Sequence, residues 1–170
     1  MKHFIILLFA VLPLATLSAQ APKFGHIDIN QLFMVMPEYN TIQKTLDSET
    51  AKLESQFTDM REELQKLESD YAQNAASLSQ QQRQAKEAEY MTMLEKVQAF
   101  FTESQQKLQQ RQQELQQPVI EKLHKAVDDV GAEEGFLYIF QVTQEVSFTL
   151  YRSAQSIDVT PLVKKKLSIQ

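Results

Sequence analysis

The 170-residue chain contains no cysteine, no tryptophan and only three glycines. Without cysteine there can be no disulfide framework, no thiolate metal site and no thiol to carry a lipid. The sequence shows no glycine-rich phosphate loop, no metal-ligand spacing and no pairing of a nucleophile with a base. We therefore expect a protein that is not an enzyme and that needs no cofactor.

Positive charge is also scarce. The formal net charge is −5, so the chain lacks the basic field with which proteins bind nucleic acid. After the N-terminal region, no apolar run is long enough to cross a bilayer. The three lysines at 164–166 are few for a membrane-binding site. Partners of these two kinds, nucleic acid and membrane, are not expected.

The first twenty residues have the pattern of a secretory signal. Lys2 and His3 precede an apolar run from Phe4 to Leu14, and Ala19-Gln20-Ala21 supplies the small-x-small cleavage pattern. We predict a signal peptide over residues 1–20, cleaved near residues 19–21. In a host with two membranes, the mature protein would then reside in the periplasm.

A glycine-free stretch, residues 39–130, dominates the mature chain and holds one proline, Pro118. Its apolar residues recur at steps of three and four, which indicates a coiled-coil seam. We predict a helical hairpin over residues 37–130, called the arm, with a turn near 73–79 and a kink near Pro118. Ser79 and Gln82 form a capping box for the second helix. The predicted seam of that helix comprises Tyr90, Leu94, Val97, Phe101, Leu108, Leu115, Val119, Leu123 and Val127 or Val130.

Residues 21–36 form the first part of a small head. Alternation over Lys23–Asn30 predicts a strand, with Gly25, Ile27 and Ile29 on the buried face. His26 would face solvent, although a role as ligand or base is an alternative reading. A capping box of Asp28 and Gln31 predicts a short helix over Gln31–Met36.

Residues 131–170 form the second part of the head. Phe136–Thr143 is apolar on both faces and predicts a strand covered on both sides. Val146–Tyr151 alternates as a further strand, and Gln144-Glu145 would allow a hairpin between the two. A last helix is predicted from Thr160 as N-cap, followed by Pro161.

A head of this size has a marginal core when alone, because fewer than about 70 residues bury little surface. Its apolar sheet also needs a cover that one copy can hardly provide, so we infer a homo-oligomer. The residues expected to hold copies together are Ile27, Ile29, Phe136, Tyr138, Phe140, Val142, Phe148 and Leu150.

The arm offers apolar side chains of its own. Methionine and aromatic residues on a thin arm suit weak contact with many partners. The candidates for such contact are Tyr71, Tyr90, Met91, Met93, Phe100 and Phe101. Met93 and Phe100 lie off the predicted seam and would line an inner apolar surface.

The chain resembles the Skp/OmpH family of periplasmic chaperones for outer-membrane proteins. The matching features are Phe24–Asn30, the long hairpin, Gln117-Pro118-Val-Ile-Glu-Lys, Ala132–Phe136 and Ile157–Thr160 with Val163. The resemblance implies a trimer whose heads form one body and whose arms surround a cavity for an unfolded client. Some family members are strongly basic, whereas this chain is acidic, which argues against lipopolysaccharide as a partner.

The sequence thus predicts a mainly α protein with a small β head, in which a coiled-coil hairpin arm projects from an oligomerisation body. The favoured function is that of an ATP-independent holdase for unfolded outer-membrane proteins. The alternative is an exported structural adaptor or spacer that docks one folded partner on its coiled coil.

Overall fold

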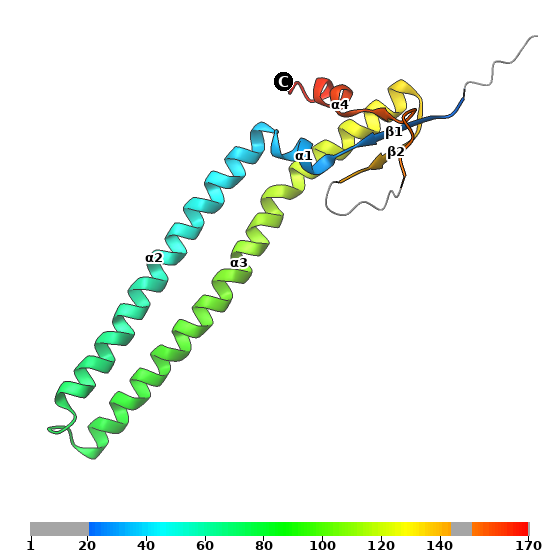
Figure 1. Cartoon of the computed structure of the whole chain (residues 1–170). Helices are drawn as coiled ribbons and strands as arrows, with labels where there is room; N and C mark the ends of the chain where they lie inside the picture. The colour runs from blue at the N-terminus through cyan, green and yellow to red at the C-terminus, as the bar shows by residue number, and fades with distance from the viewer. Residues whose placement is uncertain (1–20, 144–150, 170) are drawn as a thin grey trace, which may run out of the picture.

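The computed structural model describes residues 21–143 and 151–169, which form a long helical hairpin and a small head (Figure 1). The head holds both ends of the described chain. The signal peptide over residues 1–20, the hairpin at 144–145 and most of the strand predicted over 146–151 lie outside the described residues. The predicted fold class, mainly α with a small β head, is confirmed.

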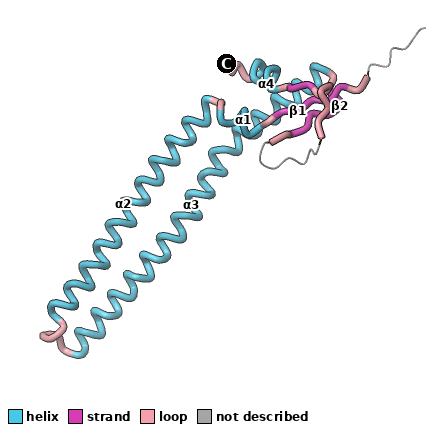
Figure 2. Tube along the Cα trace, in the orientation of Figure 1, coloured by secondary structure: helices cyan, strands magenta, loops and turns pink. Residues whose placement is uncertain are grey.

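Two helices make the arm, α2 over Pro37–Asn74 and α3 over Gln80–Glu134. They run side by side to a turn at residues 75–79, far from the head (Figure 2). With 38 and 55 residues, the helices are about 57 and 82 Å long at a rise of about 1.5 Å per residue. Pro37 occupies the first turn of α2, where its missing N–H costs nothing.

The ends of α3 are fixed by capping residues, and the capping box at its start is the one that the sequence predicts. The Ser79 hydroxyl accepts the Gln82 N–H at 3.3 Å, and the Gln82 side chain accepts the Ser79 N–H at 2.9 Å. Gly135 ends the helix in the left-handed conformation, with φ of 71°. Between these ends α3 continues through Pro118. Figure 1 shows it changing direction where green passes into yellow, near this proline.

The head contains a three-stranded sheet in the order β2-β1-β3, formed by β1 (Lys23–Ile27), β2 (Phe136–Gln141) and β3 (Ile157–Asp158). Both outer strands run parallel to β1. A parallel pair needs a long crossover connection, and here that connection is the whole arm. The third strand of this sheet is Ile157–Asp158, a segment for which the sequence predicts no strand.

The first strand is shorter than predicted. Asp28 is the N-cap of α1 (Ile29–Met34), and its carboxylate accepts the Gln31 N–H at 3.1 Å. With Asp28 as cap, the helix must begin at the next residue. The prediction that Ile29 continues the strand is therefore wrong, and Ile29 packs against the core from α1.

The last helix, α4, spans Thr160–Lys166. Its N-cap is Val159 rather than the predicted Thr160, and the Asp158 carboxylate accepts the Thr160 N–H at 2.9 Å. At the other end, Lys166 forms an ion pair with Glu133 of α3. The ion pair joins α4 to the C-terminal end of α3.

The core lies where α3 passes through the head. One stripe of α3, formed by Val119, Leu123, Ala126 and Val130, is buried, and Leu123 is 0% exposed. The cluster is completed by residues of β1, of the segment from α1 to the start of α2, and of the segment from Val159 into α4: Ile27, Leu32, Met36, Ile42, Val159 and Val163. Phe136 and Ile139 of β2 pack against it. The segment of α3 after Pro118 is thus the centre of the head as well as the root of the arm.

Gly25 permits the close approach of this core to the sheet. A Cβ at Gly25 would lie 2.8 Å from Val159 Cγ1 and 3.1 Å from the Phe136 ring. We expect Gly25→Ala to destabilise the protein by about 1–3 kcal/mol, because the added methyl overpacks the core. Urea denaturation measures the change.

Gly131→Ala is the matched control. Its added Cβ would have its nearest neighbour, Ile139 Cδ1, at an ordinary 3.5 Å, and alanine in a helix is favoured over glycine by about 0.5–1 kcal/mol. An unchanged midpoint for Gly25→Ala would contradict the packing described.

Candidate functional site

One face of the head sheet carries an exposed cluster of aromatic rings, which we call the aromatic patch: Phe24, Tyr138 and Phe140. Phe24 pairs in register with Tyr138, and His26 with Phe140. The ring centroids of the patch lie 5.8–6.4 Å apart, and the side chains are 39%, 60% and 48% exposed. Aromatic rings bury a large area when another surface covers them, so this face is suited to bind an apolar partner surface.

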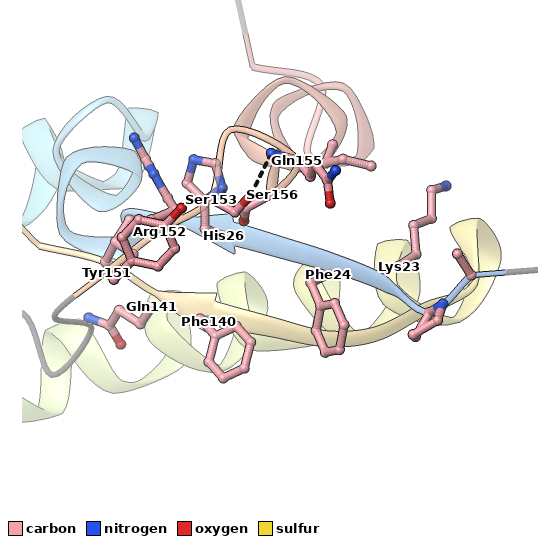
Figure 3. Close-up of a pocket in the computed structure, with 14 residues that line it drawn as sticks. Lys23, Phe24, His26, Phe140, Gln141, Tyr151, Arg152, Ser153, Gln155 and Ser156 are labelled. Carbon is pink, nitrogen blue, oxygen red and sulfur yellow. Dashed lines mark hydrogen bonds between the residues drawn. The ribbon is translucent and has the colours of Figure 1, made fainter.

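A groove borders the patch, between β1, the end of β2 and residues 151–157, with a volume of about 940 Å³. Figure 3 shows the rings of Phe24 and Phe140 side by side, with His26 next to the loop that carries Ser153 and Ser156. Tyr151 is 81% exposed and also lines the groove. The groove and the patch together form one mainly apolar surface of the head.

The sequence suggested that His26 faces solvent, but in the structure this side chain is buried. It is 8% exposed, and its Nδ1 lies 2.9 Å from the Ser156 hydroxyl. The segment before β3, which brings Ser156 to the ring, is far along the chain, so alternation along β1 cannot predict it. Burial and the charge of Arg152 lower the pKa of His26 from its ordinary 6.5, while Asp158 acts in the opposite direction.

The structure separates the eight residues expected to hold copies together. Tyr138 and Phe140 are exposed on the patch, and Val142 lines the groove. Ile27 is 1% exposed within the core of its own chain, where Ile29, Phe136 and Ile139 pack against the same cluster. Phe148 and Leu150 lie outside the described residues.

Phe24 and Leu137 are exposed but are not among the residues predicted to hold copies together. Phe24 could have been found, because it alternates with the buried Gly25 on β1. Leu137 is 58% exposed and lines a separate hollow with Gly131 and Ala132 of α3. Both residues add exposed apolar area to the head.

In the arm, the seam of α3 differs from the predicted one by a residue at two places. Met93 is 8% exposed and Leu94 is half-buried. Phe100 is half-buried, whereas Phe101 is 51% exposed. Met93 and Phe100 therefore face α2, and their prediction as off-seam residues is wrong.

Beyond these residues the seam alternates polar and apolar side chains. Between Phe100 and Leu115 the inward positions are held by Ser104, Leu108 and Arg111. Arg111 donates a hydrogen bond to Glu49 of α2 at 3.0 Å. The middle of the arm is thus held by an ion pair as well as by apolar packing.

Polar contacts also join the two helices at the root and near the tip. Lys122 of α3 pairs with Glu38 in the first turn of α2, and this hydrogen bond lowers the pKa of Glu38. Near the tip the Tyr71 hydroxyl donates to Glu87 at 3.0 Å. Exposed pairs of this kind contribute little stability, about 0–1 kcal/mol each.

The residues predicted to contact clients differ in their exposure and in their position on the arm. Met91 is 53% exposed, close to the exposed fraction of Phe101. Tyr71 and Tyr90 are half-buried and line, with Leu67 and Met91, a hollow of about 430 Å³ near the tip. Met93 is inside the seam. The arm therefore presents apolar side chains at two levels, the tip hollow and Phe101.

Two kinds of site are missing from the part of the chain that the structure describes. Residues 21–143 and 151–169 hold no group of histidine and acidic side chains that could bind a metal ion. Across the same ranges, no helix combines the length and the apolar character that a membrane span requires.

The geometry defines a class of protein: a coiled-coil hairpin arm inserted into a small parallel sheet whose outer face is aromatic and exposed. The comparison with protein families is more specific. The model of the OmpH-like outer membrane protein family matches residues 23–167, so the chain belongs to this family. It is also 26% identical, over 126 residues, to the chaperone protein Skp of Yersinia enterocolitica, covering 72% of this chain and 74% of the relative.

The buried His26 predicts that the protein loses stability in mild acid. Because its pKa is lowered by folding, the unfolded chain binds a proton more readily than the folded one. The stabilisation is present above pH 6.5 and is lost as the pH falls below it. Urea midpoints measured from pH 7.5 to 5.5 should therefore decrease, and His26→Gln should flatten the decrease.

His124→Gln is the control, because His124 is exposed on α3 and should leave the pH dependence intact. Equal slopes for the wild type and His26→Gln would show that His26 is not the group responsible.

Proposed function

We propose that the protein is an ATP-independent holdase chaperone that binds unfolded outer-membrane proteins in the periplasm and prevents their aggregation. The observation that carries the proposal is membership of the OmpH-like family across residues 23–167, which includes both the arm and the head. The relative from Yersinia enterocolitica is named a chaperone. Export follows from the signal peptide predicted over residues 1–20.

The arm is physically suited to hold unfolded chains. Two helices bury only one narrow seam, so much of their surface stays available for contact. Met91 and Phe101 project apolar side chains from that surface, and methionine adapts to contacts of many shapes. Separate weak contacts of this kind support reversible binding of clients that differ in sequence.

The aromatic patch supports assembly of several copies. Its three rings expose large apolar groups next to one another, and surfaces of this kind mark association sites. We propose that other copies of the chain cover it in a homotrimer, the state that the family resemblance implies. Three arms would then project from a common body and enclose the client between them.

The charge of the chain indicates how the client is held. The net charge is −5, and within residues 70–89 at the tip the cations are Arg83 and Lys86. Lys86 already pairs with Glu89 at 2.8 Å. We therefore propose that apolar contact, rather than attraction of anionic groups, provides the grip.

The proposed function predicts suppression of aggregation without nucleotide. An outer-membrane barrel diluted from denaturant should stay in solution when the protein is present at near-stoichiometric amounts, as light scattering would show. The barrel already folded in detergent should not bind, which separates a holdase from an adaptor for folded partners. Undiminished scattering at several-fold excess would refute the proposal.

The proposed assembly predicts that Phe140→Asp dissociates the oligomer. A charge within the aromatic patch cannot be covered by an apolar surface without a large desolvation cost. Light scattering coupled to size exclusion should show a fall in mass to that of one chain.

Phe101→Asp provides the matched control. The two side chains have similar exposed fractions, 48% for Phe140 and 51% for Phe101, but Phe101 lies on the arm, so this variant should keep the mass of the wild type. A wild-type mass for Phe140→Asp would remove the patch from the interface.

A further inference from the structure

A hollow of about 150 Å³ lies in the middle of the arm, between α2 and α3. Two small residues create it, Thr50 on α2 and Ser104 on α3, since both stand at seam positions where a coiled coil normally has large apolar side chains. The remaining lining is mainly apolar: Leu53, Phe57, Phe100, Phe101 and Leu108. We call this space the seam hollow.

The neighbouring side chains keep the seam hollow from collapsing. The Phe57 ring contacts the Phe101 ring, with 5.7 Å between their centroids. The Arg61 guanidinium lies 5.9 Å from the centroid of the Phe57 ring. On the root side, the Arg111–Glu49 ion pair fixes the spacing of the two helices. Bulky rings and an ion pair therefore act as spacers around the two small residues.

The seam hollow has the size and chemistry to bind one aromatic ring. An apolar protein cavity of about 150 Å³ stays dry and takes up benzene. Here the space is also reachable from solvent, because Phe101 at its rim is 51% exposed. Only Glu54 and Gln105, both exposed, add charged or long polar groups at the edge.

We propose that the seam hollow binds an aromatic side chain of the unfolded client, so that each arm anchors a client between its own helices. This inference rests on the proposed holdase function. The occupant follows from the client's chemistry, because outer-membrane barrels carry girdles of aromatic residues at both membrane interfaces. An unfolded barrel therefore presents aromatic side chains at intervals along its chain, and Thr50 and Ser104 leave one of them room.

Toluene tests the seam hollow without any client. Ligand-observed NMR on the full-length protein should show binding to the wild type, and Ser104→Leu should weaken it at least about tenfold, or about 1.4 kcal/mol. The leucine fills the space with a good helix former, so the variant should also melt at a higher temperature. Thr50→Leu fills the same space from the other helix and should behave alike.

Ser55→Leu is the control, because it adds the same side chain at an exposed position of α2 and should leave toluene binding unchanged. Wild-type toluene binding by both filled variants, or no binding by the wild type, would overturn the site.

An unfolded strand peptide with a single phenylalanine tests the occupant. Its affinity should fall at least about threefold, roughly 0.7 kcal/mol, both for Ser104→Leu and when its phenylalanine is replaced by alanine. The two changes together should weaken binding no further than either alone.

Toluene binding that is lost in Ser104→Leu, combined with unchanged peptide affinity, would show that the hollow exists but that no client ring enters it. Failure of the wild type to suppress aggregation would instead count against the holdase function. The two failures are therefore distinguishable.

Discussion

The head depends on the burial of one stripe of α3. Leu123 and its neighbours Val119, Ala126 and Val130 form the surface on which the other head elements pack. These elements come from both ends of the chain, and the arm is inserted between β1 and β2. Bringing β1 and β2 together closes a loop as long as the whole arm, which lowers the entropy of the chain. Burial of the stripe must offset this cost. Pro118 lies just before this stripe and marks the boundary between the part of α3 in the head and the part in the arm.

The arm has the opposite character, because a hairpin of two helices cannot surround any side chain. Its most buried seam residues beyond the head are Met93 and Val97, each 8% exposed, and further along the seam accepts Ser104 and Arg111. Stability per residue is therefore low in the arm and high at its root, a distribution that favours local opening towards the tip.

Sequence patterns predicted the arm helices well, because their periodicity and signals such as the Ser79–Gln82 capping box act locally. They failed where two neighbouring residues compete for one position. Met93 and Leu94 are both apolar, as are Phe100 and Phe101, so only the packing of α2 decides which one faces inward. The short strand Ile157–Asp158 and the cover over His26 arise from pairing with β1, over a hundred residues away, and no local pattern encodes them.

The exposed apolar groups of the head and of the arm differ in a way that matches two kinds of contact. On the head, Phe24, Tyr138 and Phe140 adjoin one another on a short sheet that is fixed from behind by the core. A rigid, continuous surface suits a permanent interface with further copies, since little entropy is lost on binding. On the arm, Met91 and Phe101 stand apart on a thin support and suit contacts that form and break separately. In the proposed assembly, the first surface would hold the body together, while the second would let the arms release their client without ATP.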